Sequence, residues 1–210
     1  KDKIYEGQMN ASVYPRPLRR QKSLTQNIVY ISPTRHASGE VFLGEVLNRP
    51  DLYEEMLSIL KEFDENILSI NYDKNNFGRG TYKILSKSNN KALPLNVYGD
   101  GMKKAILLMS AVVKANDGIL LLDEFETAIH TSAMERTFKW ILETCKKLNV
   151  QVFMTSHSIE AISKVLKCCP DMEKDIRMIT LVETLNGIKA RNVDATKAIK
   201  LKEQYGLELR

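Results

Sequence analysis

Ile119-Leu120-Leu121-Leu122-Asp123-Glu124 is the stretch that decides the fold: four apolar residues run directly into two acids. An apolar run of this length predicts a strand buried on both faces of a parallel sheet. The carboxyl ends of such strands are where open α/β sheets bind their ligands. We therefore expect Asp123 to be able to hold Mg²⁺ and Glu124 to polarise a water molecule. The alternative is that two acids simply end a strand and face solvent.

A second apolar strand supplies polar groups to the same edge. Residues 150–154 read Val-Gln-Val-Phe-Met and are followed by Thr155-Ser156-His157-Ser158. An imidazole at this edge could hydrogen-bond a terminal phosphate or the attacking water. The structural alternative is that Ser156 or Ser158 caps the next helix and His157 is a turn residue.

A glycine loop with two lysines opens an apolar helix upstream. It reads Gly99-Asp100-Gly101-Met102-Lys103-Lys104. Exposed backbone N–H groups, the helix dipole and the lysines together favour an anion there. No third glycine follows as in a dinucleotide-binding fingerprint, and a Gly-x-x-x-x-Gly-Lys-[Ser/Thr] phosphate loop occurs nowhere in the 210 residues. The motifs indicate half of a nucleotide-hydrolysing site.

The order of elements predicts an α/β fold. Helices at about 102–115, 132–148 and 159–167 alternate with strands 118–122 and 151–155, which calls for βαβ crossovers and a mostly parallel sheet. Residues 40–65 have helical periodicity that Pro50 should split into two helices. We also expect a short strand at 27–31, a hairpin of 67–72 with 81–85, another of 176–182 with 188–191, and a last short helix within 194–206.

Composition limits the class of protein. The net charge of +5 and pI of about 9 are compatible with a polyanion partner, and the densest basic cluster, residues 16–22, is either a solvated loop or an arm that contacts phosphate or DNA. The three cysteines lack metal or redox spacing, so we expect buried or idle thiols. No stretch reaches the roughly 20 apolar residues of a membrane span, and residues 1–8 lack a secretory signal. A cytoplasmic protein without membrane contact is expected, and the missing initiator Met suggests a fragment, a processed form or a renumbered chain.

In sequence order, these motifs resemble those of the ABC-type ATPases. Residues 99–104 look like the signature loop, 119–124 like the Walker B strand, 126–132 like the D-loop region and 155–157 like the switch-histidine segment. The sequences of these motifs are most similar to those of the OLD-like AAA ATPases, which are relatives of the SMC and RecF proteins. Several OLD-like ATPases belong to anti-phage defence systems. The resemblance is strongest over residues 93–165.

This resemblance implies roles for individual residues. Asp123 would position Mg²⁺ through water, Glu124 would be the general base, and His157 would contact the γ-phosphate of ATP. The loop residues, together with a serine next to the switch histidine, would bind nucleotide: Gly99, Asp100, Gly101, Lys103 and Ser156. The loop would act in trans on ATP held by a partner, so that ATP joins subunits into a homodimer or a higher oligomer.

The resemblance also implies a domain plan. Residues 1–92 would be the remainder of an amino-terminal lobe with a helical insertion and a hairpin, and 93–210 the signature, Walker B and switch half of an ABC-type P-loop NTPase core. Two departures stand out: Gly-Asp-Gly replaces the signature serine of transporters, and the phosphate loop, which lies near the amino terminus in the family, is absent. The chain would then be the carboxyl-terminal half, with the loop cut away or carried on another polypeptide, and would show no measurable ATP turnover alone.

Two other readings stay open. If the native protein ends at Arg210, no room for a Toprim nuclease domain follows His157, and an effector nuclease or toxin would be a separate partner; DNA is a further candidate ligand. The chain could instead be a non-catalytic dimerisation or DNA-tethering module of the same fold. An unrelated Asp/Glu metal enzyme is the third reading.

Overall fold

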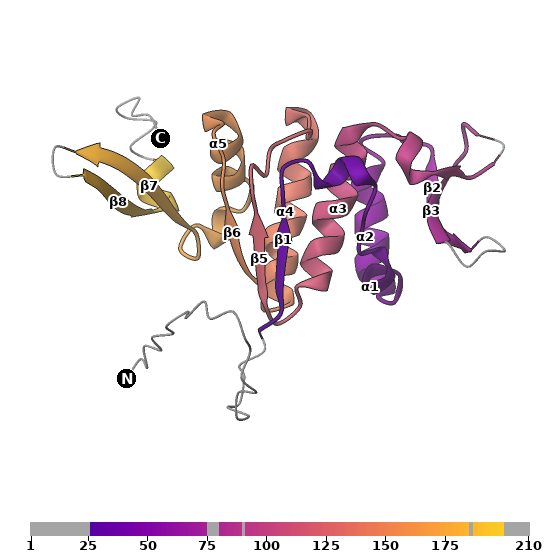
Figure 1. The fold of residues 1–210 in the computed structure, drawn as a ribbon, viewed down its shortest axis with the longest axis horizontal. Helices are drawn as coiled ribbons and strands as arrows, with labels where there is room; N and C mark the ends of the chain where they lie inside the picture. The colour runs from indigo at the N-terminus through magenta and orange to yellow at the C-terminus, as the bar shows by residue number, and fades with distance from the viewer. Residues whose placement is uncertain (1–25, 75–79, 90, 185–186, 200–210) are drawn as a thin grey trace, which may run out of the picture.

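A three-stranded parallel sheet forms the centre of the molecule (Figure 1). The computed structural model describes residues 26–74, 80–89, 91–184 and 187–199. The strands β1 (Ile28–Ile31), β5 (Ile119–Leu122) and β6 (Gln151–Met154) lie in the order β1-β5-β6. The register places Ile31 beside Leu122 and Leu122 beside Met154, so all three strands end at one edge. The predicted parallel sheet is confirmed.

Helices cover one face of this sheet. In Figure 1 the helix α4 (Thr131–Lys147) lies behind the strands and α3 (Asp100–Lys114) lies next to it on the side of β1, while α5 (Ile159–Cys168) follows β6 and packs on α4. Alternate strand residues are buried on this side, because successive side chains of a strand point to opposite faces. They are Val29, Ile31, Leu120 and Leu122. The predicted helix–strand alternation is confirmed.

The segment between β1 and α3, which we call the insertion, begins with a turn and two helices. A 3₁₀ turn, η1 (Arg35–Ser38), leads to the short helix α1 (Leu43–Leu47) and to α2 (Pro50–Leu60). Pro50 occupies the first turn of α2, where its missing N–H costs nothing. The predicted split at this proline is therefore confirmed.

The predicted hairpin after α2 is also confirmed. The strand β2 (Ile67–Lys74) pairs antiparallel with β3 (Gly80–Ser86), which pairs with the two-residue β4 (Leu93–Pro94) before the turn η2 (Leu95–Val97). The Tyr53 hydroxyl on α2 anchors this sheet, since it accepts from the Ile70 N–H at 2.8 Å and donates to the Ile70 carbonyl at 3.2 Å. On the other side of α2, the Trp140 indole of α4 donates to Glu55 Oε2 at 2.8 Å.

The carboxyl-terminal strands leave the parallel sheet. After η3 (Pro170–Met172), β7 (Arg177–Thr184) and β8 (Gly187–Asp194) form their own antiparallel pair. Within the described ranges, neither strand joins β1, β5 or β6. Residues 195–199 are helical, as expected for the start of the last helix.

Some expectations concern residues outside the described ranges. They are the loop 1–25 with its basic cluster 16–22, and the remainder of the last helix from residue 200. Within the described residues, no helix is both long and apolar enough to cross a bilayer. One hydrophobic core contains residues from both sides of position 92, and the division of the chain there stays a prediction.

Candidate functional site

The edge where β5 and β6 end brings the two predicted polar segments together. The Thr155 N–H donates to the Leu122 carbonyl at 2.9 Å, and the Phe125 N–H donates to the Thr155 carbonyl at 3.1 Å. These bonds continue the parallel ladder past the last strand residues. The segment 123–126 therefore lies directly against 155–157, as the sequence predicts.

The Thr155 hydroxyl fixes the first carboxylate. It donates to Asp123 Oδ1 at 2.6 Å and accepts from the Glu124 N–H at 2.9 Å. The Tyr30 hydroxyl at the end of β1 lies 3.4 Å from Asp123 Oδ2, so all three strands contribute to this contact. Sequence analysis missed Thr155 and Tyr30 as site residues, although the parallel register places both beside Asp123.

Glu124 and His157 converge on the solvent side of the edge. Glu124 Oε1 lies 4.0 Å from His157 Nε2, and the two side chains are 44% and 88% exposed. The Glu124 backbone has a φ of 42°, a left-handed conformation that is uncommon outside glycine, and its N–H bond to Thr155 helps to hold it there. An exposed carboxylate and an imidazole thus meet where a ligand can reach both.

Glu126 binds the backbone of the segment that carries His157. Its Oε1 accepts from the His157 N–H at 3.1 Å, while its Oε2 is buried without a hydrogen-bond partner. A buried carboxylate oxygen left unsatisfied is costly and is retained where the surroundings supply charge. Apart from the position of Glu126 in the turn after Glu124, no sequence pattern predicts this role.

The supporting charge comes from Lys104 of α3. Its side chain is fully buried, and its Nζ donates to the Pro33 carbonyl at 3.2 Å. Burial lowers the pKa of Lys104, and the negative charges of Glu126, Glu124 and Asp123, in that order, act against this shift. The glycine-loop helix is thereby linked electrostatically to the carboxylates at the sheet edge.

The predicted glycine loop lies beside the same turn. Gly99 caps α3, and a Cβ added at Gly101 would stand 3.1 Å from the Ala128 carbonyl. Lys103 pairs with Asp100 at 2.7 Å, and this partner lowers the pKa of the Asp100 carboxyl by hydrogen bonding and then by charge. The lysine predicted to attract an anion is therefore already engaged by an acid on its own helix.

The two serines beside His157 hydrogen-bond backbone groups of the turn that leads into α5. The Ser158 hydroxyl accepts from the Ala161 N–H at 3.2 Å and caps α5. Ser156 Oγ accepts from the Ser158 N–H at 3.0 Å and lies 3.4 Å from the Ser158 carbonyl. This geometry matches the structural alternative for the serines, whereas the His157 side chain stays exposed to solvent.

The donor set at the edge suits a hard cation. Among the described residues there is no group of three or more His, Cys, Asp or Glu side chains that could hold a metal ion. Asp123 and Glu124 offer carboxylate oxygens, and Mg²⁺ is usually held by one or two carboxylates together with phosphate oxygens and water. The residues present fit a metal that arrives with a phosphate ligand.

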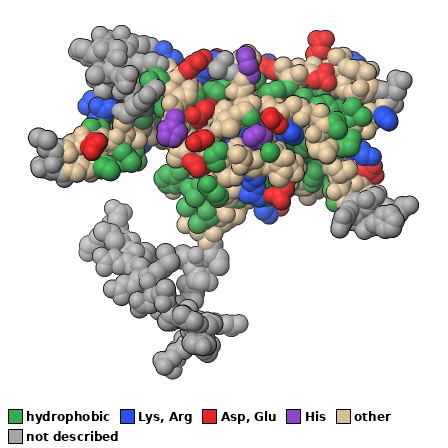
Figure 2. All heavy atoms as spheres, turned by 45° about the horizontal axis from the view of Figure 1, so that its top comes forward, with side chains coloured by type: hydrophobic (Ala, Val, Ile, Leu, Met, Phe, Trp, Pro, Cys, Tyr) green, Lys and Arg blue, Asp and Glu red, His purple; other side chains and the backbone are tan. Residues whose placement is uncertain are grey.

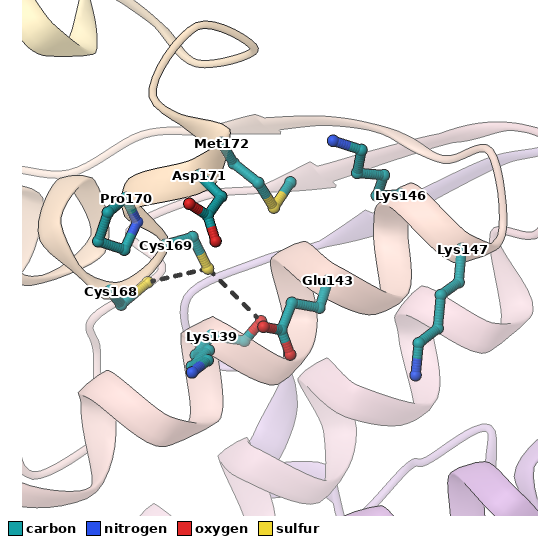
Figure 3. Close-up of a pocket in the computed structure, with 9 residues that line it drawn as sticks. All are labelled: Lys139, Glu143, Lys146, Lys147, Cys168, Cys169, Pro170, Asp171 and Met172. Carbon is teal, nitrogen blue, oxygen red and sulfur yellow. Dashed lines mark hydrogen bonds between the residues drawn. The ribbon is translucent and has the colours of Figure 1, made fainter.

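A hollow lies away from this edge (Figure 3). Its volume is about 360 Å³, and its lining includes Glu143 and Lys146 of α4 with Cys169 and Met172. Both α4 and α5 begin at the site edge and run back, so this hollow lies toward the opposite end of the sheet. Burial raises the pKa of both Cys168 and Cys169, and the Cys169 thiol is 3.9 Å from the Lys139 carbonyl. The expectation of buried thiols is confirmed.

The fold and the family together define the class of protein. A parallel sheet flanked by helices, with acids at its carboxyl edge, is the arrangement of the P-loop NTPases. A family profile described as "AAA domain, putative AbiEii toxin, Type IV TA system" matches residues 18–163. The chain belongs to this family of AAA domains, and it is related to the ABC-type ATPase superfamily.

Two relatives match in sequence. An ATP/GTP phosphatase of Helicobacter pylori (strain ATCC 700392 / 26695) is 33% identical over 131 residues, which are 60% of this chain and 34% of that protein. The uncharacterized protein MJECL11 of Methanocaldococcus jannaschii is 28% identical over 112 residues, 53% of this chain and 98% of the relative. The chain thus spans about a third of the length of the Helicobacter relative.

Solved structures of SMC ATPases share the fold. One, from work on the ATP-driven dimerization and DNA-stimulated activation of SMC ATPases, superposes with a TM-score of 0.50 at 14% identity, over 75% of this chain and 92% of that one. An Smc head bound to the C-winged helix domain of ScpA gives 0.50 at 13% identity, over 71% and 44%. At this identity the likeness concerns the fold, and it confirms the predicted α/β class.

Proposed function

We propose that this chain supplies the carboxylate and histidine half of a Mg-ATP hydrolysing site, within the OLD-like branch of the ABC-type ATPases. One observation carries the proposal: Asp123 and Glu124 from β5 meet His157 from β6 at a single sheet edge, with Lys104 of the glycine-loop helix buried beneath them. Membership in a family of AAA domains supports it.

Each residue would have a separate task. Asp123, held through both oxygens, would position the metal, and bound Mg-ATP would supply the phosphoryl group that accepts the nucleophile. Glu124 would accept the proton of the attacking water, since its carboxylate is exposed and fixed at the backbone. His157 would hydrogen-bond the terminal phosphate, and its 4.0 Å distance to Glu124 would bring water and phosphate together.

Assembly through ATP belongs to the same proposal. Gly99, Asp100, Gly101 and Lys103 would cover ATP held by a partner subunit, with Ser156 beside the histidine of the receiving site. SMC ATPases are described as dimerizing with ATP and as activated by DNA. We propose that this chain likewise forms a homodimer or a higher oligomer and that it binds DNA. We also propose that it acts with an effector nuclease or toxin subunit in anti-phage defence. Its residues 93–210 would form the catalytic half, and 1–92 the rest of the lobe.

A second candidate is a non-catalytic dimerisation or DNA-tethering module. One observation favours it: the 210 residues contain no Gly-x-x-x-x-Gly-Lys-[Ser/Thr] loop. Without backbone N–H groups and a lysine around the phosphates, most ground-state binding of ATP is lost. In the catalytic proposal, these groups come from a segment outside the 210 residues.

Phosphate release by the native assembly, isolated through a tag on this chain, tests the proposal. We expect Glu124→Gln to lower turnover by about 10²–10⁴-fold while nucleotide binding is retained. Glu143→Gln, an exposed acid of α4 at the distant hollow, is the matched control and should leave turnover unchanged. The isolated 210 residues should show none. Equal turnover in Glu124→Gln and wild type would refute the assignment, and ATP-independent assembly without turnover would favour the module.

A further inference from the structure

Two adjacent thiols line the hollow between α4 and the end of α5 (Figure 3). Cys168 is the last residue of α5, and Cys169 follows it outside the helix, with a φ of −134° and a ψ of 76°. Successive side chains of a continuous helix point about 100° apart. Because the helix ends between these residues, the two side chains turn to the same wall, and their Sγ atoms are 3.8 Å apart.

This separation is that of two sulfur atoms bound to one metal ion. A thiolate sulfur binds a metal such as Zn²⁺ at about 2.3 Å. Two such bonds at a tetrahedral angle place the sulfur atoms about 3.8 Å apart, and at a trigonal angle about 4.0 Å. The two thiols therefore already have the spacing at which a single ion can replace their protons.

The turn η3 supplies a third sulfur. The Met172 N–H donates to the Cys169 carbonyl at 2.9 Å, which closes this turn. Side chains three residues apart in a 3₁₀ turn lie on the same side. Met172 and Cys169 accordingly both line the hollow, and Figure 3 shows their side chains extending into the same space.

The donor set selects a soft metal ion. Thiolate and thioether sulfur together bind Cu(I), whereas structural Zn²⁺ takes four ligands from cysteine, histidine and carboxylate side chains. The described part of the chain has no group of three or more His, Cys, Asp or Glu side chains that could hold a metal ion, which argues against zinc. Figure 2 shows histidine side chains beside acidic ones at the surface, and among the described residues no histidine lines the hollow.

The charges around the hollow would stabilise such a complex. One Cu⁺ ion with two thiolates carries one negative charge, and the lining includes the lysines Lys139, Lys146 and Lys147. Burial raises the pKa of the Cys169 thiol, and the Lys139 charge acts in the opposite direction. Binding would release two protons: Cu⁺ and two cysteine thiols give the dithiolate complex and 2 H⁺, and no electron is transferred.

We propose that Cys168, Cys169 and Met172 form a binding site for one monovalent copper ion. The ion would join the end of α5 to η3 through the two thiolates and the thioether. The hollow lies toward the opposite end of the sheet from Asp123 and Glu124, so this site is independent of the proposed function.

Anaerobic competition with the coloured Cu(I) chelator bicinchoninate tests the site in the native assembly, isolated through a tag on this chain. We expect the wild type to hold one more Cu(I) per chain than Cys169→Ser, which should lower the affinity by at least about 100-fold. Met172→Leu should lower it by about 10-fold. The matched control is Cys145→Ser, which changes a buried thiol outside the lining of the hollow and should bind as the wild type does.

Several results would overturn the site. They are no copper uptake by the wild type, an affinity that Cys169→Ser leaves unchanged, and an equal loss in Cys145→Ser and Cys169→Ser when circular dichroism shows both variants folded. Met172→Leu keeps both thiols and a side chain of similar volume, so it carries the test if the serine variant does not fold. An affinity in Met172→Leu equal to that of the wild type would refute the three-sulfur site.

Discussion

Replacing Gly101 with alanine tests how closely the glycine loop approaches the carboxylate turn. The new Cβ would stand 3.1 Å from the Ala128 carbonyl and 3.5 Å from Phe63 Cε1. The first distance is shorter than ordinary van der Waals contact. The obstacle is backbone, and Ala128 itself has a φ of 68°, so the turn between Glu124 and α4 has little freedom to move aside.

Two opposing effects set the magnitude. Alanine in place of glycine stabilises a helix by up to about 1 kcal/mol, and less in the first turn, where Gly101 lies. Overpacking of a tight contact costs about 1–3 kcal/mol. We therefore expect Gly101→Ala to lower the free energy of unfolding by about 1–2 kcal/mol.

Urea unfolding followed by circular dichroism measures this difference. Gly99→Ala is the matched control for stability, since a Cβ there meets nothing within 4 Å and the residue has an ordinary φ of −62°. Alanine is a poorer N-cap than glycine, but it also reduces the conformational entropy of the unfolded chain, and the two effects oppose each other, so the free energy of unfolding should change by about 0.5 kcal/mol or less. Gly101→Ala at least as stable as wild type would show that the contact with Ala128 is not tight and would refute the reasoning.

Three further predictions concern the site and the core. Thr155→Val should lower the free energy of unfolding by about 1–2 kcal/mol, because it removes the hydroxyl that donates to Asp123 and accepts from the Glu124 N–H. Thr155→Ser keeps this hydroxyl, so equal urea midpoints for the two variants would contradict the prediction. Burial raises the pKa of Cys145 to about 12, so its thiol should resist Ellman's reagent at about pH 8 in the folded protein and react in urea; modification without urea would count against it. Burial lowers the pKa of Lys104 in the folded protein below its value of 10.5, so between these two pKa values the unfolded chain binds more protons and the free energy of unfolding rises with pH. Lys104→Met should remove this contribution to the pH dependence of the urea midpoint, and identical pH profiles of variant and wild type would refute it.

Local patterns carried most of the fold prediction. The apolar run before Asp123 predicted a central parallel strand, and Pro50 predicted a helix start, because each signal acts through neighbouring residues. The meeting of Asp123 with the Thr155–His157 segment also followed from sequence, since parallel strands end at one edge. The roles assigned to these residues in hydrolysis remain predictions.

Contacts between distant segments could not be predicted in the same way. Lys103 and Lys104 are adjacent, yet the first keeps 12% of its side chain exposed and pairs with Asp100, whereas the second is fully buried. Only the rotation of α3 against the segment at Pro33 decides between them. The partner of β7 was predicted, but its separation from the parallel sheet depends on the path of the chain after α5, which no periodicity encodes.

The contact between α4 and the insertion gives the protein an optical reporter. Trp140 is the single tryptophan of the 210 residues, it is 5% exposed, and its indole hydrogen-bonds Glu55 of α2. Its emission should be blue-shifted in the folded state and should move to longer wavelength when α2 separates from α4. Since α4 also begins at the site edge, intrinsic fluorescence can test, without any label, whether added Mg-ATP separates α2 from α4.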